Sequence, residues 1–182
     1  MTVTAILSIG LVRTRKLLFR AVTDQMAATE LSRFFAPEVA GRIRASDIAL
    51  EPGQAELREA AILMVDLRGF TPLSHRIAPG DVMALLSEYQ SRVVAAVTGH
   101  GGSIDKYLGD GIMASFGATR PSPTYAADAL AAVEEILEVT AAWSRARAAA
   151  GEPAIEINAA VATGAVLFGV VGYESRLEYT VM

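Results

Sequence analysis

The sequence predicts an α+β fold for most of its 182 residues. Short apolar runs typical of strands occur at residues 59–67, 103–117 and 154–164, and the stretches between them have the apolar spacing of amphipathic helices. Residues 103–117 contain two such runs joined by Gly109-Asp110-Gly111. Asp-Gly between strands is a strong hairpin signal because both residues tolerate a positive φ. Strands linked partly by helices and partly by a hairpin indicate an α+β arrangement.

The first predicted strand, residues 59–67, is a continuous apolar run of the kind found in strands buried on both faces. Thr71-Pro72 is expected to open a short helix, since proline is well placed at the first helical position. Residues 81–98 predict an amphipathic helix. Its apolar side consists of Val82, Leu85, Leu86, Tyr89, Val93 and Val97.

The second half continues the alternation of helix and strand. Ser122-Pro123 is expected to cap a long alanine-rich helix that ends near Gly151. Residues 154–164 then alternate as a strand, and residues 165–172 allow another strand that turns back. The resulting order, β-α-β-β-α-β, is that of a ferredoxin-like split βαβ unit.

The N-terminal part divides into two further segments. Residues 13–50 predict a helical linker interrupted at Pro37, and the polar loop at residues 51–56 marks a boundary before a domain at residues 57–182. Residues 1–12 are apolar but reach only about half the length that a membrane-spanning helix needs. They are followed by four basic residues, Arg13, Arg15, Lys16 and Arg20. Residues 1–12 are therefore either an element packed on the domain or the end of a membrane span whose basic side is cytoplasmic.

Composition excludes several classes of site. The chain has no cysteine, which rules out disulfides and cysteine-ligated zinc and favours a reducing, cytoplasmic setting. That setting extends to the cytoplasmic face of the membrane if residues 1–12 belong to a span. The two histidines, His75 and His100, lie far apart, so a histidine metal centre is not expected. The net charge of −4 argues against a general nucleic-acid binder.

Two carboxylates are expected at one edge of the sheet. Asp66 ends the first strand and Asp110 lies in the hairpin turn, and in a βαββαβ sheet these strands are neighbours. Close carboxylates repel each other, and divalent cations remove that cost. Two-metal sites also activate phosphoryl displacement, and magnesium suits carboxylates together with substrate phosphates. Taken singly, Asp110 could be only a turn residue and Asp66 only a helix N-cap.

The segment Leu67–Thr71, "LRGFT", leads from the first strand into the short helix. A glycine turn at a helix start directs backbone N–H groups at an anion, here most naturally a triphosphate. Gly69 alone could be a simple turn residue. Beside Asp66 and Asp110, it predicts a metal–triphosphate site.

Three motifs of the chain resemble the class III nucleotidyl cyclases, the adenylate and guanylate cyclase family. They are "VDLRGFTPLS" at residues 65–74, "GGSIDKYLGDGIMASFG" at 101–117 and "GYESRLEYTV" at 172–181. "LSRFFAPEVAGRI" at 31–43 resembles the segment that often precedes the family's catalytic domain. The resemblance implies a ferredoxin-like cyclase fold that works as a homodimer with active sites between subunits. It also implies two divalent metals, Mg or Mn, that drive attack of the ribose 3′-hydroxyl on the α-phosphate, giving a cyclic nucleotide and pyrophosphate.

The resemblance also implies roles for the residues near the hairpin. By position, Asp66 and Asp110 are similar to the family's two metal-binding catalytic aspartates, and the Leu67 carbonyl to an additional ligand. The segment Gly69–Thr71, which includes Phe70, resembles the turn that binds the phosphates in the family.

Lys106 matches the family position that reads the purine, and Thr180 matches its partner. A lysine donates to a ring nitrogen and a threonine can accept from the amino group of adenine. Guanine presents the opposite pattern, and cyclases that read it are expected to carry an acid at the lysine position. The resemblance therefore implies ATP as substrate, although a solvated lysine at a strand end is the simpler interpretation of Lys106 alone.

The match breaks at the C-terminus. In the family, a glycine-led motif with an asparagine and a basic residue follows the segment that here ends in Met182, so the catalytic domain is expected to be C-terminally incomplete. The favoured function is an adenylate cyclase making 3′,5′-cyclic AMP for intracellular signalling. The alternative is a catalytically inactive truncated module that dimerises and binds metal–ATP. A diguanylate cyclase is disfavoured because its Gly-Gly-acid-acid-Phe signature is absent.

Overall fold

The computed structural model describes residues 25–26, 29–30, 39–41, 51–173 and 176–182. The chain forms two units, Met1–Arg44 and Ala45–Met182, and the second holds every element discussed below. The predicted apolar segment 1–12 and most of the predicted linker 13–50 lie outside the described residues, so these two assignments stay predictions. Of the helices that are described, none combines the length and the apolar character needed to cross a membrane.

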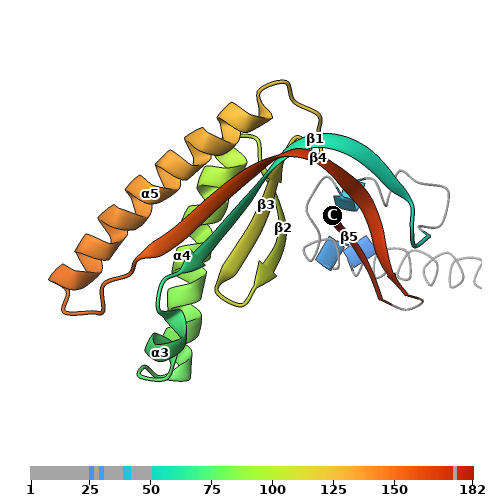
Figure 1. Ribbon diagram of the computed structural model, residues 1–182. Helices are drawn as coiled ribbons and strands as arrows, with labels where there is room; N and C mark the ends of the chain where they lie inside the picture. Colours follow the sequence, from blue (N-terminus) through green and yellow to red (C-terminus); the bar gives the residue numbers. More distant parts are fainter. Residues whose placement is uncertain (1–24, 27–28, 31–38, 42–50, 174–175) are drawn as a thin grey trace, which may run out of the picture. The chain divides into compact units, whose positions relative to one another are not determined.

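The elements of the second unit follow the predicted order (Figure 1). They are β1 (Ala55–Leu67), α3 (Phe70–Ser74), α4 (Pro79–Gly99), β2 (Ser103–Leu108), β3 (Gly111–Phe116), α5 (Tyr125–Ala149), β4 (Ile157–Tyr173) and β5 (Arg176–Val181). The expectation that residues 165–172 turn back as a separate strand is wrong. They continue β4 without a break, because β4 is paired with β1 as far as Gly169.

The strands form one five-stranded sheet in the order β2-β3-β1-β4-β5, and every neighbouring pair is antiparallel. The first four strands have the arrangement of the predicted ferredoxin-like unit. β1 pairs with β3 over Ala61–Val65 and with β4 along its whole length. Figure 1 shows these two long strands, β1 and β4, arching together across the unit.

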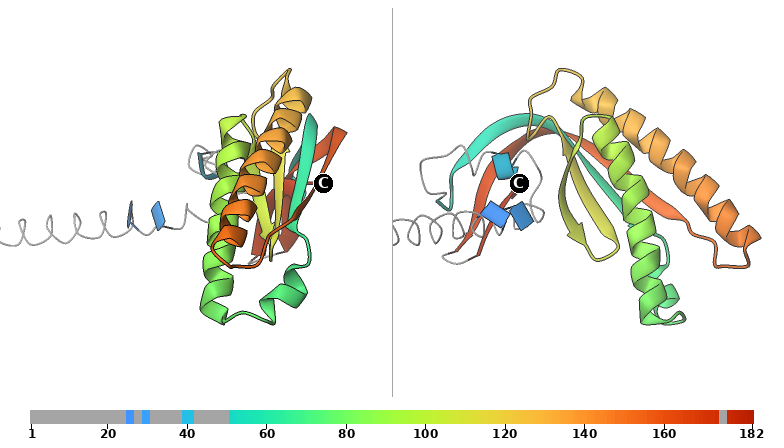
Figure 2. Two further views of the ribbon diagram at one scale, coloured as in Figure 1. Left: turned by 90° about the vertical axis from the view of Figure 1, so that its left-hand side faces the viewer. Right: turned by 180° about the vertical axis from the view of Figure 1, so that it is seen from behind.

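Two long helices cover one face of the sheet (Figure 2). α4 buries residues at helical spacing, Leu85, Tyr89, Val93, Ala96 and Val97. α5 contributes small side chains, of which Ala129 and Ala132 are fully buried, so that the helix approaches its neighbours closely. From β1, the alternate residues Leu63, Val65 and Leu67 point into the same core.

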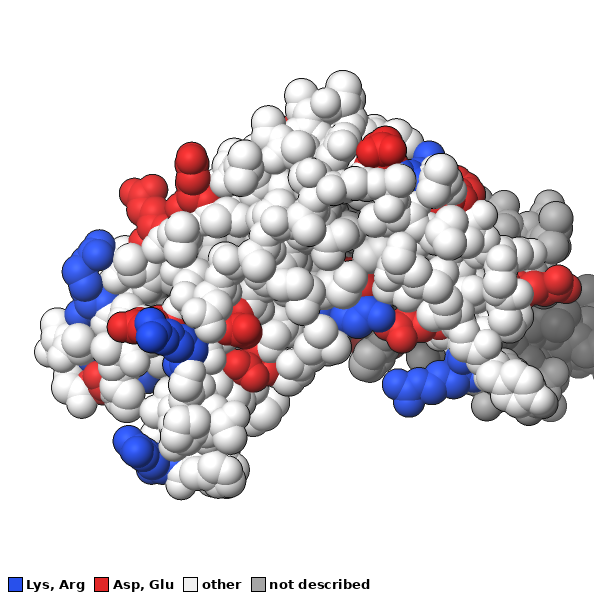
Figure 3. Space-filling view, in the orientation of Figure 1, with Lys and Arg blue, Asp and Glu red and all other residues white. Residues whose placement is uncertain are grey.

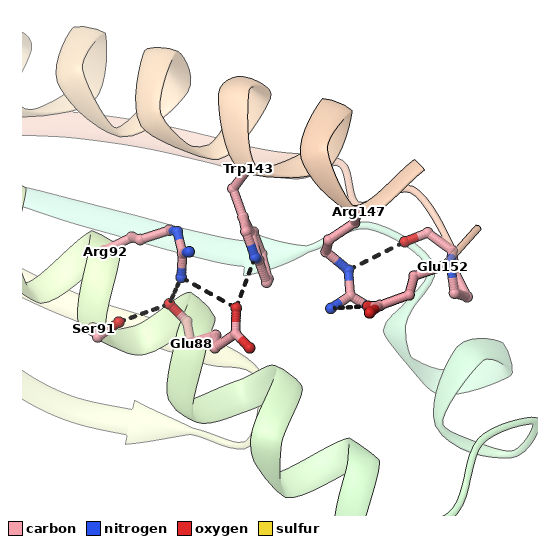
Figure 4. Close-up of polar contacts among 7 residues, drawn as sticks. Glu88, Ser91, Arg92, Trp143, Arg147 and Glu152 are labelled. Atoms are coloured by element: carbon pink, nitrogen blue, oxygen red, sulfur yellow. Dashed lines mark hydrogen bonds and ion pairs between the residues drawn. The ribbon is translucent and has the colours of Figure 1, made fainter. Parts of the chain in front are cut away.

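A polar cluster joins α4 to α5 around Trp143 (Figure 4). The indole Nε1 donates to Glu88 Oε2 at 2.9 Å, and the Arg92 guanidinium lies 4.6 Å from the ring centroid. The Arg147 guanidinium is 5.3 Å from the same ring and pairs with Glu152 at 2.7 Å. Cation–π contacts and a satisfied indole N–H stabilise the aromatic side chain between the two helices.

The opposite face of the sheet carries the alternate side chains of each strand, those that point away from the helices. Met64 lies across from Met113 of β3 and Ala160 of β4, and Lys106 of β2 lies across from Met113. Asp66 follows Met64 by two residues and therefore shares its face. On the face of the unit that Figure 3 shows, charged side chains of both signs are interspersed. Attraction for an anionic ligand on this face would therefore come from local groups rather than from a field of one sign.

Replacing Gly169 by alanine is expected to destabilise the fold by about 2–3 kcal/mol. The added Cβ would lie 2.2 Å from the Gln54 carbonyl oxygen and 2.5 Å from the Ala55 Cα. Relief of these overlaps requires β4 to move away from β1, because both obstacles are backbone atoms. A loss of this size lowers the unfolding midpoint by about 5–10 °C in a chain of this length, which circular dichroism during heating measures.

The matched control is Gly164→Ala in the same strand. An added Cβ at that position meets no atom of the described residues within 4 Å, so the midpoint should stay within about 2 °C of the parent value. An equal loss in both variants would contradict this account.

Candidate active site

Asp66 and Asp110 reach the same edge of the sheet. Asp66 lies at the end of β1, and Asp110 lies in the turn between β2 and β3. The backbone N–H of Leu67 donates to Asp110 Oδ2 at 3.3 Å, which ties the hairpin turn to the end of β1. Gly109, in the left-handed region at φ 70°, supplies the backbone conformation of the turn. The turn therefore presents a carboxylate beside the end of the central strand.

The two carboxylates line one pocket of about 400 Å³. The wall consists of three segments from distant parts of the chain, namely residues 64–72, the hairpin turn and one residue of β4. The lining residues are Met64, Val65, Asp66, Leu67, Arg68, Gly69, Phe70, Thr71, Pro72, Leu108, Asp110, Gly111 and Asn158. The predicted carboxylates and the predicted phosphate-binding turn are thus brought together.

Two acidic residues and one basic residue, Arg68, line the pocket, and the Arg68 guanidinium pairs with Glu156 at 3.1 Å. Neither Asp66 nor Asp110 forms an ion pair with a Lys, Arg or His among the described residues. Asn158 Nδ2 donates to Asp66 Oδ1 at 2.8 Å and so fixes the orientation of that carboxylate. Two carboxylates without an ion-pair partner suit a hard divalent ion such as Mg²⁺ or Mn²⁺.

The donor set fits a metal that keeps open positions. In the part of the chain that is described, no third His, Cys, Asp or Glu joins these carboxylates into a complete ligand cluster. The remaining ligands would have to be backbone carbonyls such as that of Leu67, water, or phosphate oxygens of a substrate. Magnesium in nucleotide-processing sites is typically held in this way.

Tyr89 of α4, predicted only as part of an apolar helix face, lies near enough to the two carboxylates for their charges to act on its hydroxyl. Its side chain is fully buried, and its hydroxyl has no hydrogen-bond partner among the described residues. Burial raises the pKa of this hydroxyl, and the charges of Asp66 and Asp110 raise it further. The phenol therefore stays protonated beside the acidic pocket. A buried, unpartnered hydroxyl in a predicted helix face leaves no trace in the spacing of residues.

The turn after β1 adopts the conformation that its glycine permits. Gly69 has φ 69° and stands at the N-cap of α3 without a side-chain cap, and the Leu73 N–H bonds to the Gly69 carbonyl at 3.2 Å. Phe70 packs against the core and Thr71 is exposed. Residues 69–71 all line the pocket.

Lys106 and Thr180 meet in a second cluster. They come from β2 and β5, which are the two edges of the sheet. Thr180 Oγ1 donates to Asp105 Oδ2 at 2.7 Å, and Lys106 Nζ lies 3.6 Å from the same Asp105 oxygen. Lys106 Nζ also pairs with Glu178 Oε1. The predicted purine-reading residues are therefore neighbours, held by two acids that sequence analysis missed.

Asp105 is the acid of this second cluster whose side chain is buried, beside the buried Thr180. Its side chain is 4% exposed, against 25% for Lys106. Burial raises the pKa of the Asp105 carboxyl, whereas the Thr180 hydroxyl and the Lys106 cation oppose that rise. The one signal in the sequence is position, since Asp105 directly precedes Lys106 and Glu178 stands two residues before Thr180 on β5.

The two clusters remain separate within the chain. No hydrogen bond or ion pair of the described residues connects Asp66 or Asp110 with Lys106 or Thr180. Lys106 and Thr180 are also not among the residues that line the pocket. One group of residues suits a metal-bound phosphate and the other suits the edge of a base.

Comparison with known proteins identifies the family of the chain. Residues 54–181 match the family described as the adenylate and guanylate cyclase catalytic domain. An adenylate cyclase of Anabaena cylindrica is 32% identical over 133 residues, which cover 73% of this chain and 26% of that protein. Adenylate cyclase 1 of Rhizobium meliloti (strain 1021) is 34% identical over 134 residues, 71% of this chain and 20% of that protein. The chain thus spans about a quarter or less of the curated relatives it matches.

Solved structures show the same architecture. The guanylyl cyclase Cya2 is 33% identical with a TM-score of 0.65, and the match covers 70% of this chain and 65% of that chain. The adenylyl cyclase CyaB from P. aeruginosa is 26% identical with a TM-score of 0.66, and the match covers 71% of this chain and 67% of that chain. The predicted α+β cyclase fold is confirmed. By its matched residues and its fold, this chain belongs to the class III nucleotidyl cyclases, the adenylate and guanylate cyclase catalytic domain family.

Proposed function

We propose that the chain is an adenylate cyclase domain that converts ATP to 3′,5′-cyclic AMP and pyrophosphate. The observation that carries this proposal is the pocket in which Asp66 and Asp110 lie together without an ion-pair partner among the described residues. A divalent ion offsets the repulsion between two carboxylates that share a pocket. The metal-dependent phosphate chemistry of the family would account for the presence of this carboxylate pair.

Each residue group then has a role on the nucleotide. Asp66, Asp110 and the Leu67 carbonyl would hold two divalent ions, Mg²⁺ or Mn²⁺, which would supply charge compensation for the triphosphate and for the attacking 3′-hydroxyl. Asn158 keeps the Asp66 carboxylate oriented. The turn at residues 69–71 binds phosphate through its backbone N–H groups.

The choice of ATP over GTP rests on Lys106 and Thr180. The relatives include both adenylate and guanylyl cyclases, so family membership leaves the base open. Lys106 donates to the N1 position of adenine, and Thr180 accepts from the amino group. The contact of both side chains with Asp105 supports this pairing, because it brings them to one place.

A homodimer would join the two clusters. The carboxylate pocket of one subunit and the Lys106–Thr180 cluster of the other would together enclose one nucleotide, as the family resemblance implies. Met64 and Leu108, which border the pocket, are 39% and 51% exposed. A partner subunit that covers them would stabilise the dimer by removing apolar surface from water.

The absence of cysteine supports a cytoplasmic location for this activity.

Purified chain supplied with Mn²⁺ and ATP is expected to produce cyclic AMP, and Asp110→Ala is expected to lower the rate by at least about a hundredfold. The substitution removes a ligand of the metal that compensates charge in the transition state. Product formation is measured by chromatography of the nucleotides.

Asp81→Asn is the matched control, because Asp81 is an exposed acid in the first turn of α4. Its rate should equal that of the parent chain. Metal-dependent ATP binding without turnover, lost in Asp110→Ala, would instead identify a cyclase-derived module that binds metal–ATP and leaves it unchanged. Equal activity in Asp110→Ala and the parent would overturn the site assignment.

An equal mixture of the Asp110→Ala and Lys106→Ala variants is expected to recover about a quarter of the parent rate, although each variant alone is inactive. Half of the dimers in the mixture contain one copy of each variant, and one of the two sites in such a dimer is intact. Cyclic AMP formation is assayed after the variants are mixed and allowed to exchange subunits.

The oligomeric state of each variant, measured by light scattering after gel filtration, is the control. Dimers that exchange subunits without recovering any activity would show that both clusters act on the nucleotide within one chain. Monomers in all samples would overturn the dimer proposal.

A further inference from the structure

We propose that Asp105 is a positioning residue that makes the site select adenine over guanine, because it holds the Thr180 hydroxyl as a hydrogen-bond acceptor for the base. This inference rests on the proposed function and deepens it. Asp105 acts through Thr180 and Lys106, which would contact the base, and need not contact the nucleotide itself.

Asp105 reaches Thr180 because of two features of the sheet. The sheet curls until its edge strands, β2 and β5, bring these side chains within 2.7 Å. The pairing of β2 with β3 also shifts register between Ile104 and Lys106, which is a β-bulge at Asp105. In a regular strand, consecutive side chains point to opposite faces. The bulge re-aims one of them, so that Asp105 and Lys106 both join the same cluster.

The Thr180 hydroxyl has one proton, which it donates within the chain. It donates to Asp105 Oδ2 at 2.7 Å, and its only other acceptor among the described residues is the Val181 carbonyl at 3.4 Å. The shorter contact, to a carboxylate, is also the stronger one. A hydroxyl whose proton is committed offers only its lone pairs to a ligand.

Lys106 supplies the complementary group. An ammonium has three protons and no lone pair. Two of its donor directions face Asp105, at 3.6 Å, and Glu178. One proton therefore remains for a base. The cluster presents an acceptor from Thr180 and a donor from Lys106, side by side.

This donor–acceptor pair fits one purine and opposes the other. Adenine has an amino group that donates to Thr180 and a ring nitrogen, N1, that accepts from Lys106. Guanine has a carbonyl oxygen and an N1–H at these positions, so an acceptor would face an acceptor and a donor would face a donor. Without Asp105, the Thr180 hydroxyl could turn and donate to the guanine oxygen. The carboxylate therefore contributes discrimination rather than general affinity.

The test measures ATP and GTP dissociation constants of the full 182-residue chain with Mn²⁺ by calorimetry, for the parent and for Asp105→Ala. The parent should prefer ATP, and Asp105→Ala should reduce that preference about tenfold, which corresponds to the loss of one oriented hydrogen bond. Thr180→Val should reduce it similarly. The double variant should show little further loss, because both changes remove the same interaction.

Glu178→Gln is the matched control. Glu178 is the other carboxylate against Lys106, but no contact of the described residues connects it with the Thr180 hydroxyl. This variant should shift the affinity for both nucleotides together and leave their ratio within about twofold. Unfolding midpoints show whether each variant folds. If Asp105→Ala does not fold, Asp105→Leu replaces it, because leucine has a similar shape and no acceptor for the Thr180 hydroxyl. The ATP:GTP affinity ratio of Asp105→Leu should fall, whereas that of Glu178→Gln should not.

The outcomes separate this inference from the proposed function. A parent chain that prefers ATP, with the preference lost in Asp105→Ala and Thr180→Val, supports the inference even if no cyclic AMP forms. An Asp105→Ala variant that folds and keeps the full ATP preference overturns it. A parent that binds ATP and GTP equally also overturns it, while cyclase activity on either nucleotide would still stand. A parent that binds neither nucleotide overturns both.

Discussion

β1 is hydrogen-bonded on both sides, to β3 over Ala61–Val65 and to β4 along its whole length, and the carboxylate pocket depends on this pairing. Antiparallel pairing with β3 brings the end of β1 beside the start of β3, where the hairpin turn lies. Pairing with β4 places Asn158 directly across from Asp66. The pocket wall therefore consists of groups whose positions follow from sheet register, supported from the other face by α4 and α5.

The curl of the same sheet creates the second cluster. β2 and β5 are its two edges, yet Asp105 and Lys106 of one contact Thr180 and Glu178 of the other. Edge strands carry unpaired backbone groups that invite pairing with other chains. Side-chain contacts between the edges hold β5 in place and assemble a polar surface there.

The two clusters treat negative charge in opposite ways. Asp105 is buried, and its carboxylate is compensated within the protein by a hydroxyl and an ammonium group. A buried charge of this kind is retained only with such partners. Asp66 and Asp110 lack a cationic partner among the described residues and line a hollow instead. The Lys106–Thr180 cluster is complete and suited to a neutral base edge, whereas the carboxylate pocket is suited to binding cations and phosphate.

Local sequence determined the elements and the polar residues at their ends. Apolar spacing predicted β1, α4 and the β2–β3 hairpin, because burial imposes a period on each of them. The sequence motifs predicted which polar side chains form the candidate site, namely Asp66, Asp110, Lys106 and Thr180. Local sequence missed Asp105, because a bulge overrides the alternation on which such predictions depend. Helical spacing placed Tyr89 on the apolar side of α4, but spacing does not show that its hydroxyl lacks a partner among the described residues and lies near two carboxylates. Only the tertiary structure decided that the sheet edges meet, since contacts between residues 105 and 180 depend on the curvature of the whole sheet.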